Sequence, residues 1–285
     1  MIKSLNYFLQ AIVIYLLFLI SRIIGIKASR KIFSFIFCLV GPFFKSKNTI
    51  KNNIKNFSKN ISDSQRNIII NEMWKNYGMT FIEYIFLDYF RKNTNHIEII
   101  GLDNILNQIE DKKPLIFVSG HFANFELMSM EITKNNINLA TIYRPINNFF
   151  LNPFMEYLRK KYVCKNRIKK GINGVREAIG FIKRKYSIAL MIDQRVSEGE
   201  KLNFFGKPAL TTTLPAQLAS KYNLKIIPVF IERLKNNKFK MEFQKEIDPK
   251  RFKNKMDLTK ELNNVLEKMI IKNPNQWIWT HDRWK

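Results

Sequence analysis

The sequence predicts an α/β fold in which a mostly parallel, mixed sheet is flanked by helices and preceded by a hydrophobic helical anchor. Short apolar runs alternate with helical patterns from residue 96 onward, as is typical of strand–helix–strand units around a parallel sheet. Hydrophobic residues make up 46% of the 285 residues, with only 10 Gly and 9 Pro. This composition can form a core and excludes a disordered or low-complexity chain.

Residues 1–44 are expected to anchor the chain to a membrane. Their first apolar run, residues 7–20, reads YFLQAIVIYLLFLI and has one polar interruption. Extended to Ile26, the run is long enough to cross a bilayer, but it then includes Arg22. A signal peptide is disfavoured because no small-residue cleavage site comes after Ile20.

The second apolar run, residues 32–44, contains Gly41 and Pro42, which are expected to break a helix there. Neither run alone is a convincing spanning helix. One tilted span and a helical hairpin lying in one leaflet are therefore both open.

Positive charge dominates the sequence. The first 62 residues hold ten Lys or Arg and no Asp or Glu, and only Lys3 precedes the first apolar run. This bias predicts that the chain beyond that run lies on the cytoplasmic side, held against anionic headgroups. The whole chain has 48 basic and 23 acidic residues, a net charge of +25. Either an anionic partner or broad compositional drift accounts for that excess.

The body of the protein is expected over residues 45–285, with a helical lead-in at 62–90. Ser62 begins that lead-in as a helix cap, and apolar residues then recur at a spacing of four, which indicates a helix that faces the core. Strands are predicted at 97–100, 114–119, 140–144, 187–193, 225–232 and 239–243. Helices are predicted at 103–110, 124–134, 150–161, 173–184, 214–222 and 257–272.

A His and a Glu lie at one predicted strand-to-helix corner, PLIFVSGHFANFELM, residues 114–128. Gly120 permits a sharp exit from the strand, His121 comes next, and Glu126 falls in the first turn of the next helix. Ligand sites in such sheets gather beyond the carboxyl ends of strands. A carboxylate that reaches back to the imidazole fixes its tautomer and raises its basicity, as a general base requires. Helix capping alone would also explain both residues.

Five short blocks resemble, in kind and order, those of the lysophospholipid-type acyltransferases, and within them the bacterial lipid A late acyltransferases. The corner GHFANFE is similar to the H-x4-(D/E) block of that superfamily. The other blocks are IYRP at 142–145, LMIDQR at 190–195 with FFGKPALTTTLPAQLA at 204–219, IIPVFIER at 226–233 and QWIWTHDRWK at 276–285. Phe149 and Asp282 depart from the usual pattern and leave the acceptor open.

The resemblance implies that an acyl group passes from acyl carrier protein to a hydroxyl of a lipid A precursor. The reaction belongs to the late acylation of lipopolysaccharide biosynthesis, at the cytoplasmic face of the bacterial inner membrane. His121 is expected to act as general base and Glu126 to orient it, without a covalent intermediate. The resemblance implies no metal, and no cofactor besides the acyl carrier protein thioester as co-substrate.

The same blocks imply further substrate-binding residues. Arg144 is expected to contact a lipid A phosphate or to support the oxyanion. Six residues are expected at the substrate: Arg144, Arg159, Asp193, Gln194, Phe205 and Gly206. Arg159 lies in the stretch 151–185, which has eleven basic residues and two Glu and is expected to receive acyl carrier protein or anionic headgroups. His281 lies between Trp279 and Trp284, and these two indoles are expected in a closing core contact or at the membrane interface. A second catalytic histidine is the less favoured alternative for His281.

Two other functions stay open. One is an acyltransferase of the same superfamily that acts on a glycerophospholipid, a lysolipid or a glycolipid. The other is a membrane-tethered, basic nucleic-acid-binding protein without catalysis. That second function requires basic and aromatic residues interleaved on one binding element, and no such element is found in the sequence. The expected partners are therefore acyl carrier protein, the lipid A precursor and membrane lipids, and no nucleic acid.

Overall fold

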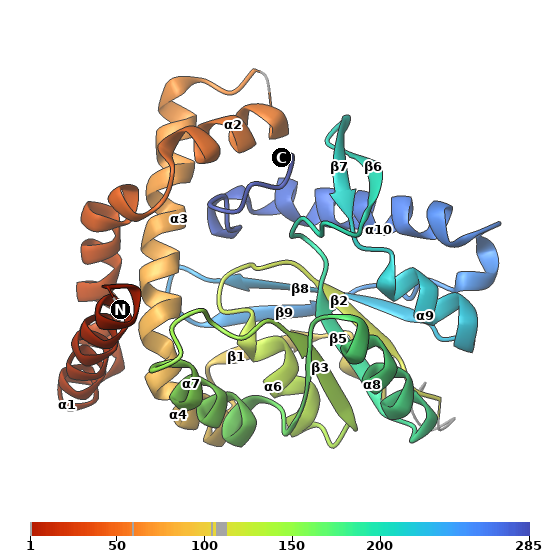
Figure 1. Cartoon of the computed structure of the whole chain (residues 1–285), viewed down its shortest axis with the longest axis horizontal. Helices are drawn as coiled ribbons and strands as arrows, with labels where there is room; N and C mark the ends of the chain where they lie inside the picture. The colour runs from red at the N-terminus through yellow and green to blue at the C-terminus, as the bar shows by residue number, and fades with distance from the viewer. Residues whose placement is uncertain (1, 59, 104, 107–112) are drawn as a thin grey trace.

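The computed structural model describes all residues except 1, 59, 104 and 107–112 and contains a seven-stranded sheet with a separate two-stranded hairpin (Figure 1). The strand order is β1-β9-β8-β2-β5-β3-β4; β8 and β9 pair antiparallel, and every other neighbouring pair is parallel. The strands are β1 (Ile97–Ile100), β2 (Ile116–Ser119), β3 (Leu139–Tyr143), β4 (Asn166–Lys169), β5 (Ser187–Met191), β8 (Ile226–Arg233) and β9 (Phe239–Phe243), with β6 (Glu200–Phe204) and β7 (Lys207–Thr211) in the hairpin.

Helices cover both faces of the sheet, with α6 and α8 on one side and α10 on the other (Figure 1). The predicted α/β class with a mostly parallel, mixed sheet is confirmed. The helices are α1 (Ile2–Phe44), α2 (Lys47–Phe57), α3 (Asp63–Glu83), η1 (Tyr84–Phe86), α4 (Leu87–Lys92), α6 (Glu126–Lys134), α7 (Asn152–Leu158), η2 (Arg159–Val163), α8 (Ile172–Lys183), α9 (Leu214–Tyr222), η3 (Pro249–Arg251), α10 (Lys255–Lys272) and η4 (Pro274–Gln276).

All six predicted strands are present, each within two residues of the expected ends. The central strand β2 is buried along its whole length, which is why it reads as a continuous apolar run rather than an alternating one. Strands β4, β6 and β7 were not predicted, because they are rich in Lys and Asn and are largely half-exposed or exposed. Most of the helix expected at 103–110 lies outside the described residues.

The amino-terminal helix α1 is sharply bent at Gly25, whose φ of 79° and ψ of 168° are not helical. The rings of Phe18 and Phe33 both contact Phe81, at centroid distances of 5.5 and 6.0 Å. In a straight helix, residues 18 and 33 would lie about 22 Å apart along the axis. In addition, Ser29 Oγ donates to the carbonyl of Ser21. The two halves of α1 therefore fold back toward each other.

The break expected at Gly41 and Pro42 is not present, since α1 continues to Phe44. Only two residues of the helix come after Pro42, so the proline disturbs little of it. Gly41 serves another purpose, because a Cβ atom there would collide with the indole of Trp74 on α3. Gly78 in turn lets α3 approach the carbonyl of Phe33. Small residues on both helices thus permit close packing.

Both halves of α1 contact the rest of the protein along their length. Near the amino terminus, Tyr7 packs edge-on against Phe149, and Tyr15 donates to the carbonyl of Phe150. Farther along, Arg22 forms a bidentate ion pair with Asp88 on α4. Helix α1 therefore packs onto the folded body as well as presenting an apolar surface.

The outward side of α1 is apolar. The segment Lys3–Phe43 is long and apolar enough to cross a membrane by length and composition, and little of its most apolar stretch is buried. Its exposed large hydrophobic residues are Leu5, Phe8, Leu9, Ile12, Val13, Tyr15, Leu16, Leu19, Ile20, Ile23, Ile24, Ile32, Phe35, Leu39, Val40 and Phe43. We call this set the apolar face of α1. Phe149 and Phe150, which touch the first half of α1, are also exposed and extend that face.

Candidate active site

A cavity of about 550 Å³ lies at the carboxyl ends of β2, β3 and β5. His121 comes after β2, Arg144 after β3 and Gln194 after β5, and all three line the cavity. Part of the wall is apolar, formed by Phe125, Met128, Ile142, Val163, Leu190 and Met191. The basic residues that line it are Lys45, Arg144, Arg159, Arg167, Lys170 and Arg195. The cavity thus combines a surface for a hydrocarbon chain with cations for an anionic group.

Asp193 orients the imidazole of His121. The Nδ1 atom of His121 lies 2.8 Å from Oδ1 of Asp193, and the backbone amide of His121 donates to Oδ2 of the same carboxylate, also at 2.8 Å. Trp277 Nε1 donates a third hydrogen bond to Oδ2. Asp193 is only 2% exposed, so its position is tightly fixed. An Asp on Nδ1 leaves Nε2 as the basic nitrogen.

The sheet register explains why these two residues meet. Ser119 in β2 pairs with Met191 in the parallel strand β5. His121 and Asp193 each lie two residues beyond that pair, at the same edge of the sheet. Gly120 makes the turn possible, because a Cβ atom at this position would collide with the Phe122 ring.

The interaction shifts the pKa values of both partners. Burial alone would lower the pKa of His121, but the charge of Asp193 and its hydrogen bond outweigh burial, and the pKa is raised. The nearby charge of Glu126 raises it further. Burial would raise the pKa of Asp193, yet His121 and Trp277 lower it to about 2. The imidazole is therefore more basic than a free histidine, as a general base requires.

Glu126 does not hydrogen-bond to His121, which differs from the sequence-based expectation. Its Oε1 atom accepts hydrogen bonds from the Tyr84 hydroxyl at 2.6 Å and from Arg159 Nε at 2.7 Å. Arg159 Nη2 also donates to the Tyr84 oxygen. Glu126 still lines the cavity with His121. The position next to Nδ1 is already taken by Asp193, and Arg159 supplies Glu126 with a cation of its own.

Arg159 is placed at the cavity by an irregular helix. The five residues Arg159–Val163 form a π-helical turn at the end of α7, a feature that often marks functional sites. Burial alone would lower the pKa of Arg159, but Glu126 and Tyr84 outweigh burial and raise it. Arg159 was expected to bind substrate; among the described residues its Nε and Nη2 atoms are bonded to Glu126 and Tyr84.

The remaining predicted residues divide into two groups. Arg144 and Gln194 line the cavity, and their contact with substrate stays a prediction. Asp193 was also expected to bind substrate, but its carboxylate is occupied by His121 and Trp277. The sequence predicts its position at the end of β5 but not its partner.

Phe205 and Gly206 do not line the cavity. Both have positive φ, 51° and 70°, and form the turn of the β6–β7 hairpin; consecutive positive φ values are typical of a type I′ hairpin turn. The Phe205 ring packs edge-on against Phe57 of α2, and its amide donates to Glu267 of α10. These contacts give both residues a structural role, and their contact with substrate stays a prediction.

The carboxyl-terminal segment closes the back of the site. Phe122 forms an isolated bridge with Trp277, whose indole reaches Asp193. Trp279 is fully buried, which confirms the core contact rather than a membrane-interface position for that indole. His281 lines the cavity, but its Nε2 accepts a hydrogen bond from the Arg195 amide. Burial also lowers the pKa of His281, so this ring is suited to holding the loop of Arg195.

Sequence reasoning missed Tyr84 and Trp277, which donate hydrogen bonds to Glu126 and Asp193, and Glu83, which accepts one from Asn124. Tyr84 and Glu83 lie at the end of a helix that was expected to serve the core alone. The sequence did contain a signal for them, since Glu83 and Tyr84 lie in an otherwise apolar stripe. A charged residue on a buried face needs a partner, so Glu83 could have been expected to bind one.

Cys164 also lines the cavity, but its thiol is not set up as a nucleophile. It is 3% exposed, and its Sγ donates to the carbonyls of Leu139 and Asn166. Burial raises the pKa of the thiol, which disfavours the reactive thiolate.

Comparison with known proteins identifies relatives of the chain. A family model described as bacterial lipid A biosynthesis acyltransferase matches residues 1–285. A lipid A biosynthesis palmitoleoyltransferase of Escherichia coli is 22% identical over 252 residues, which cover 86% of this chain and 80% of the relative. A lipid A biosynthesis acyltransferase of Shigella flexneri matches with the same identity and coverage. Among solved structures, the 1-acyl-sn-glycerophosphate acyltransferase of Thermotoga maritima matches with a TM-score of 0.42 and 15% identity, over 89% of this chain and 99% of that one.

Proposed function

The chain belongs to the bacterial lipid A biosynthesis acyltransferase family, and we propose that it transfers a fatty acyl group from acyl carrier protein to a hydroxyl of a lipid A precursor. Family membership makes the protein an acyltransferase, which sets aside the non-enzymatic alternative. The finer proposal is a late acylation, in which the acceptor hydroxyl belongs to a 3-hydroxyacyl chain already attached to the precursor. The only co-substrate in this proposal is the acyl carrier protein thioester, with no further cofactor.

His121 acts as the general base. An alcohol is a weak nucleophile at neutral pH, so its proton must leave as the oxygen attacks the thioester carbonyl. Asp193 occupies Nδ1, and in the described part of the chain Nε2 has no hydrogen-bond partner. Nε2 removes the proton of the acceptor hydroxyl and returns it to the departing thiolate of the carrier. The charge that develops on the imidazole during attack is stabilised by Asp193.

Glu126 supports the base from a second direction. Its charge raises the pKa of His121 without a direct hydrogen bond. Arg159 and Tyr84 hold one carboxylate oxygen, Oε1. We assign the other oxygen, Oε2, to the acceptor hydroxyl, which it orients toward His121. Glu126 thus acts through the acceptor hydroxyl and through its charge, and not by orienting the His121 ring as expected from the sequence.

The cavity lining suits both substrates. The acyl chain lies against the apolar wall formed by residues such as Phe125, Met128 and Val163. Arg144 is exposed and lines the same cavity, where a guanidinium can bind a lipid A phosphate in bidentate fashion. The basic stretch 151–185 attracts the acidic acyl carrier protein and speeds encounter.

The protein lies at the cytoplasmic face of the inner membrane. The apolar face of α1 enters one leaflet as a bent hairpin, rather than as a span, because both halves also pack against the body. Exposed lysines of this region, such as Lys27, Lys31 and Lys51, then face anionic headgroups. This arrangement supports uptake of an acceptor that is itself a membrane lipid.

The observation that carries the proposal is the His121–Asp193 pair within a partly apolar cavity. The test is to incubate the purified, full-length enzyme with labelled acyl carrier protein and a tetraacyl lipid A precursor. Mass spectrometry should show one added acyl chain on a secondary hydroxyl. Lysophosphatidic acid serves as the competing acceptor; transfer to it and not to the precursor would support the glycerophospholipid alternative instead.

A further inference from the structure

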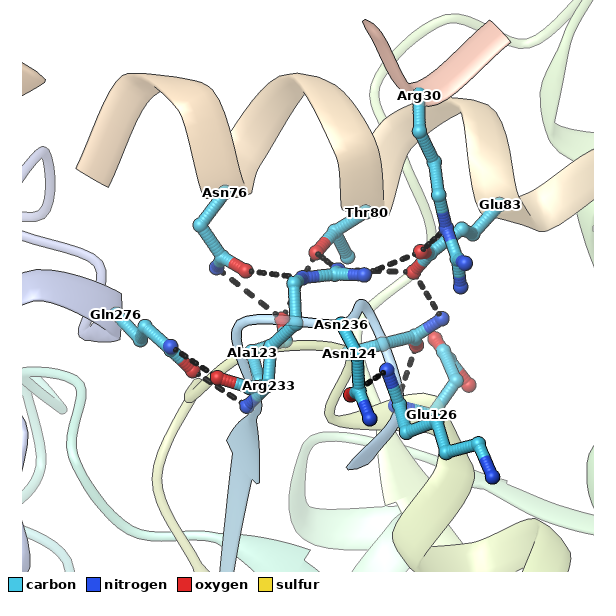
Figure 2. A network of polar contacts seen from close by, with 11 residues as sticks. Arg30, Asn76, Thr80, Glu83, Ala123, Asn124, Glu126, Arg233, Asn236 and Gln276 are labelled. Carbon is cyan, nitrogen blue, oxygen red and sulfur yellow. Dashed lines mark hydrogen bonds and ion pairs between the residues drawn. The ribbon is translucent and has the colours of Figure 1, made fainter. Parts of the chain in front are cut away.

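Glu83, at the end of α3, is fully buried between two arginines (Figure 2). Arg30 Nε lies 2.6 Å from its Oε1, and Arg233 contacts both oxygens, with Nη2 3.0 Å from Oε2. Arg30 and Arg233 are 9% and 7% exposed. Burying three charged groups costs more free energy than an apolar cluster of the same size. The cluster therefore calls for a reason other than stability.

The cluster is connected to the catalytic corner, residues 121–126. Glu83 Oε2 accepts a hydrogen bond of 2.9 Å from Asn124 Nδ2, and Asn124 Oδ1 accepts from the backbone amide of Glu126 at 3.3 Å (Figure 2). Asn124 is 1% exposed, so water does not compete for these bonds. Two hydrogen bonds thus link Glu83 to the start of α6, where Glu126 lines the cavity.

The same cluster holds a strained residue in the middle of the corner. Ala123 has a φ of 44°, a left-handed conformation that is unfavourable for a residue with a Cβ atom. Its carbonyl accepts from Thr80 Oγ1, and its amide donates to the backbone carbonyl of Gln276. Arg233 contacts Thr80 through Nη2 and exchanges two hydrogen bonds with the Gln276 side chain (Figure 2). The network thereby stabilises the backbone between His121 and Glu126.

Arg30 brings the amino-terminal helix into this network. It lies five residues beyond the bend of α1, on the half that packs on α3. We propose that Glu83 is a positioning residue for the catalytic corner, and that Arg30 makes this positioning depend on the seating of the bent helix α1. The inference rests on the proposed function for the role of the corner, and it links an apolar, membrane-facing element to the geometry of catalysis.

The variant that tests the link most directly is Asn124→Ala, which keeps the three buried charges paired. We expect kcat to fall by about 10- to 100-fold through misplacement of Glu126, with KM for the acyl carrier protein thioester within about twofold of wild type. The matched control is Asn263→Ala. Asn263 is also 1% exposed and holds the carbonyl of Asn203 in the hairpin, so its loss should lower Tm and leave kcat per folded molecule unchanged.

Arg30→Met tests the contribution of α1. Arg233 still pairs with Glu83 in this variant, and Arg30 Nη2 has no hydrogen-bond partner among the described residues, so methionine leaves few buried groups unpaired. Residue 30 lies on α1 and not at the catalytic corner, yet kcat should fall in this variant as it does in Asn124→Ala. Arg30→Lys should restore part of the rate, because it returns the charge. A kcat within twofold of wild type in Arg30→Met would overturn the role assigned to α1.

A second measurement does not depend on the substrate. The charged and titratable groups around His121 are Asp193, Glu126, Arg159 and His281, and only Glu126 is held through Asn124. With three histidines in the chain, NMR of ¹⁵N-histidine-labelled protein can follow the His121 titration in wild type and variants.

A shift of that titration to lower pH in Asn124→Ala and Arg30→Met, and not in Asn263→Ala, supports the proposal even if the wild type proves inactive on the lipid A precursor. A His121 titration that is unchanged in both Asn124→Ala and Arg30→Met would refute the positioning role of Glu83. Inactivity of the wild type on the lipid A precursor would refute only the proposed function.

Discussion

His121 Nδ1 lies 2.8 Å from Oδ1 of Asp193, and the His121 amide donates to the second oxygen of that carboxylate. One buried aspartate therefore fixes the ring and the backbone of the same residue. Rotation of the imidazole would break the Nδ1 contact, and the amide hydrogen bond holds the carboxylate in place to restore it. Because the two residues lie just beyond paired parallel strands, the position of the imidazole is determined by the register of β2 and β5.

His121→Ala should abolish acyl transfer. Loss of a general base costs about 10²- to 10⁴-fold in rate, and alanine cannot take the proton. The fold should survive, since Asp193 keeps its bonds to the residue 121 amide and to Trp277. Transfer is measured with labelled acyl carrier protein, and Tm by circular dichroism. Turnover near the wild-type level would remove His121 from the mechanism.

Asp193→Asn should lower kcat by at least about 100-fold, because the imidazole loses its tautomer control and the charge that stabilises its protonated form. Asp193 is also the largest influence that raises the pKa of His121. The acidic limb of the kcat/KM profile should therefore move to lower pH. A limb that stays in place would show that another group titrates there.

The same pair predicts how stability depends on pH. The pKa of Asp193 is lowered to about 2 in the folded state, so its contribution exists above about pH 3.9, its unfolded pKa, and fades as pH falls toward 2. The pKa of His121 is raised, so its contribution is complete below about pH 6.5 and fades as pH rises through the folded pKa.

The free energy of unfolding lost in Asp193→Asn should therefore be largest between about pH 4 and 6.5. Urea denaturation of wild type and variant across this range measures it. A difference that is flat from about pH 4 to about pH 9 would contradict an ion pair between the two side chains.

Glu126→Gln should leave a small residual rate and lower the pKa of His121, since the carboxylate charge is lost while the shape is kept. The variant also leaves Arg159 buried without its carboxylate, and a lower Tm is expected. Tyr84→Phe is the control, because it removes one hydrogen bond to Oε1 and preserves the charge. Comparing the pH dependence of kcat/KM in the two variants separates the effect of the Glu126 charge from that of its hydrogen-bonded position. If the acidic limb lies at the same pH in wild type and in Glu126→Gln, the electrostatic role of Glu126 is contradicted.

Membrane binding should depend on the apolar face of α1. Leu19→Glu together with Ile23→Glu places two charges on residues that are 60% and 78% exposed, where the fold does not require apolar side chains. Flotation with anionic phospholipid vesicles should show much less bound protein than for wild type. Ile172→Glu, at a residue 79% exposed on α8, is the matched control and should bind as wild type does. Equal loss in both would indicate a non-specific effect of charge.

Substitutions suit this test better than deletion of residues 1–44. The deletion would remove Phe33 from the core and Arg30 from Glu83. The truncated protein is therefore expected to lose stability as well as its apolar face, and its distribution between fractions would report misfolding.

Local patterns were sufficient for the buried strands of the sheet. The apolar runs that became β2, β5 and β8 are buried strands, and such runs are readable without knowledge of their neighbours. Strand β4 was missed because it is a short edge strand, NRIK, with a single apolar residue, Ile168. The break in α1 was misplaced because a glycine can serve close packing, as Gly41 does, or a bend, as Gly25 does. Only the partner helix distinguishes the two.

The partners within the site could not be read from the sequence. His121 and Glu126 are near in the chain and are therefore expected to pair, whereas Asp193 is 72 residues away and meets His121 only through the β2–β5 register. The spatial order of strands is a long-range property that no local spacing encodes. For the same reason the apolar stripe of residues 62–90 predicts only a core-facing helix, although Tyr84 and Glu83 each contact residues far along the chain.

The bend at Gly25 has a consequence for how the protein reaches its membrane. In the proposed in-leaflet arrangement both halves of α1 stay bound to the same folded body, so no stretch of polypeptide would have to cross the bilayer. Delivery can then come after completion of the chain, without a translocation channel, as the finished enzyme settles onto the lipid surface. Release would be equally direct, and the amount of enzyme at work would depend on the free area and composition of that surface.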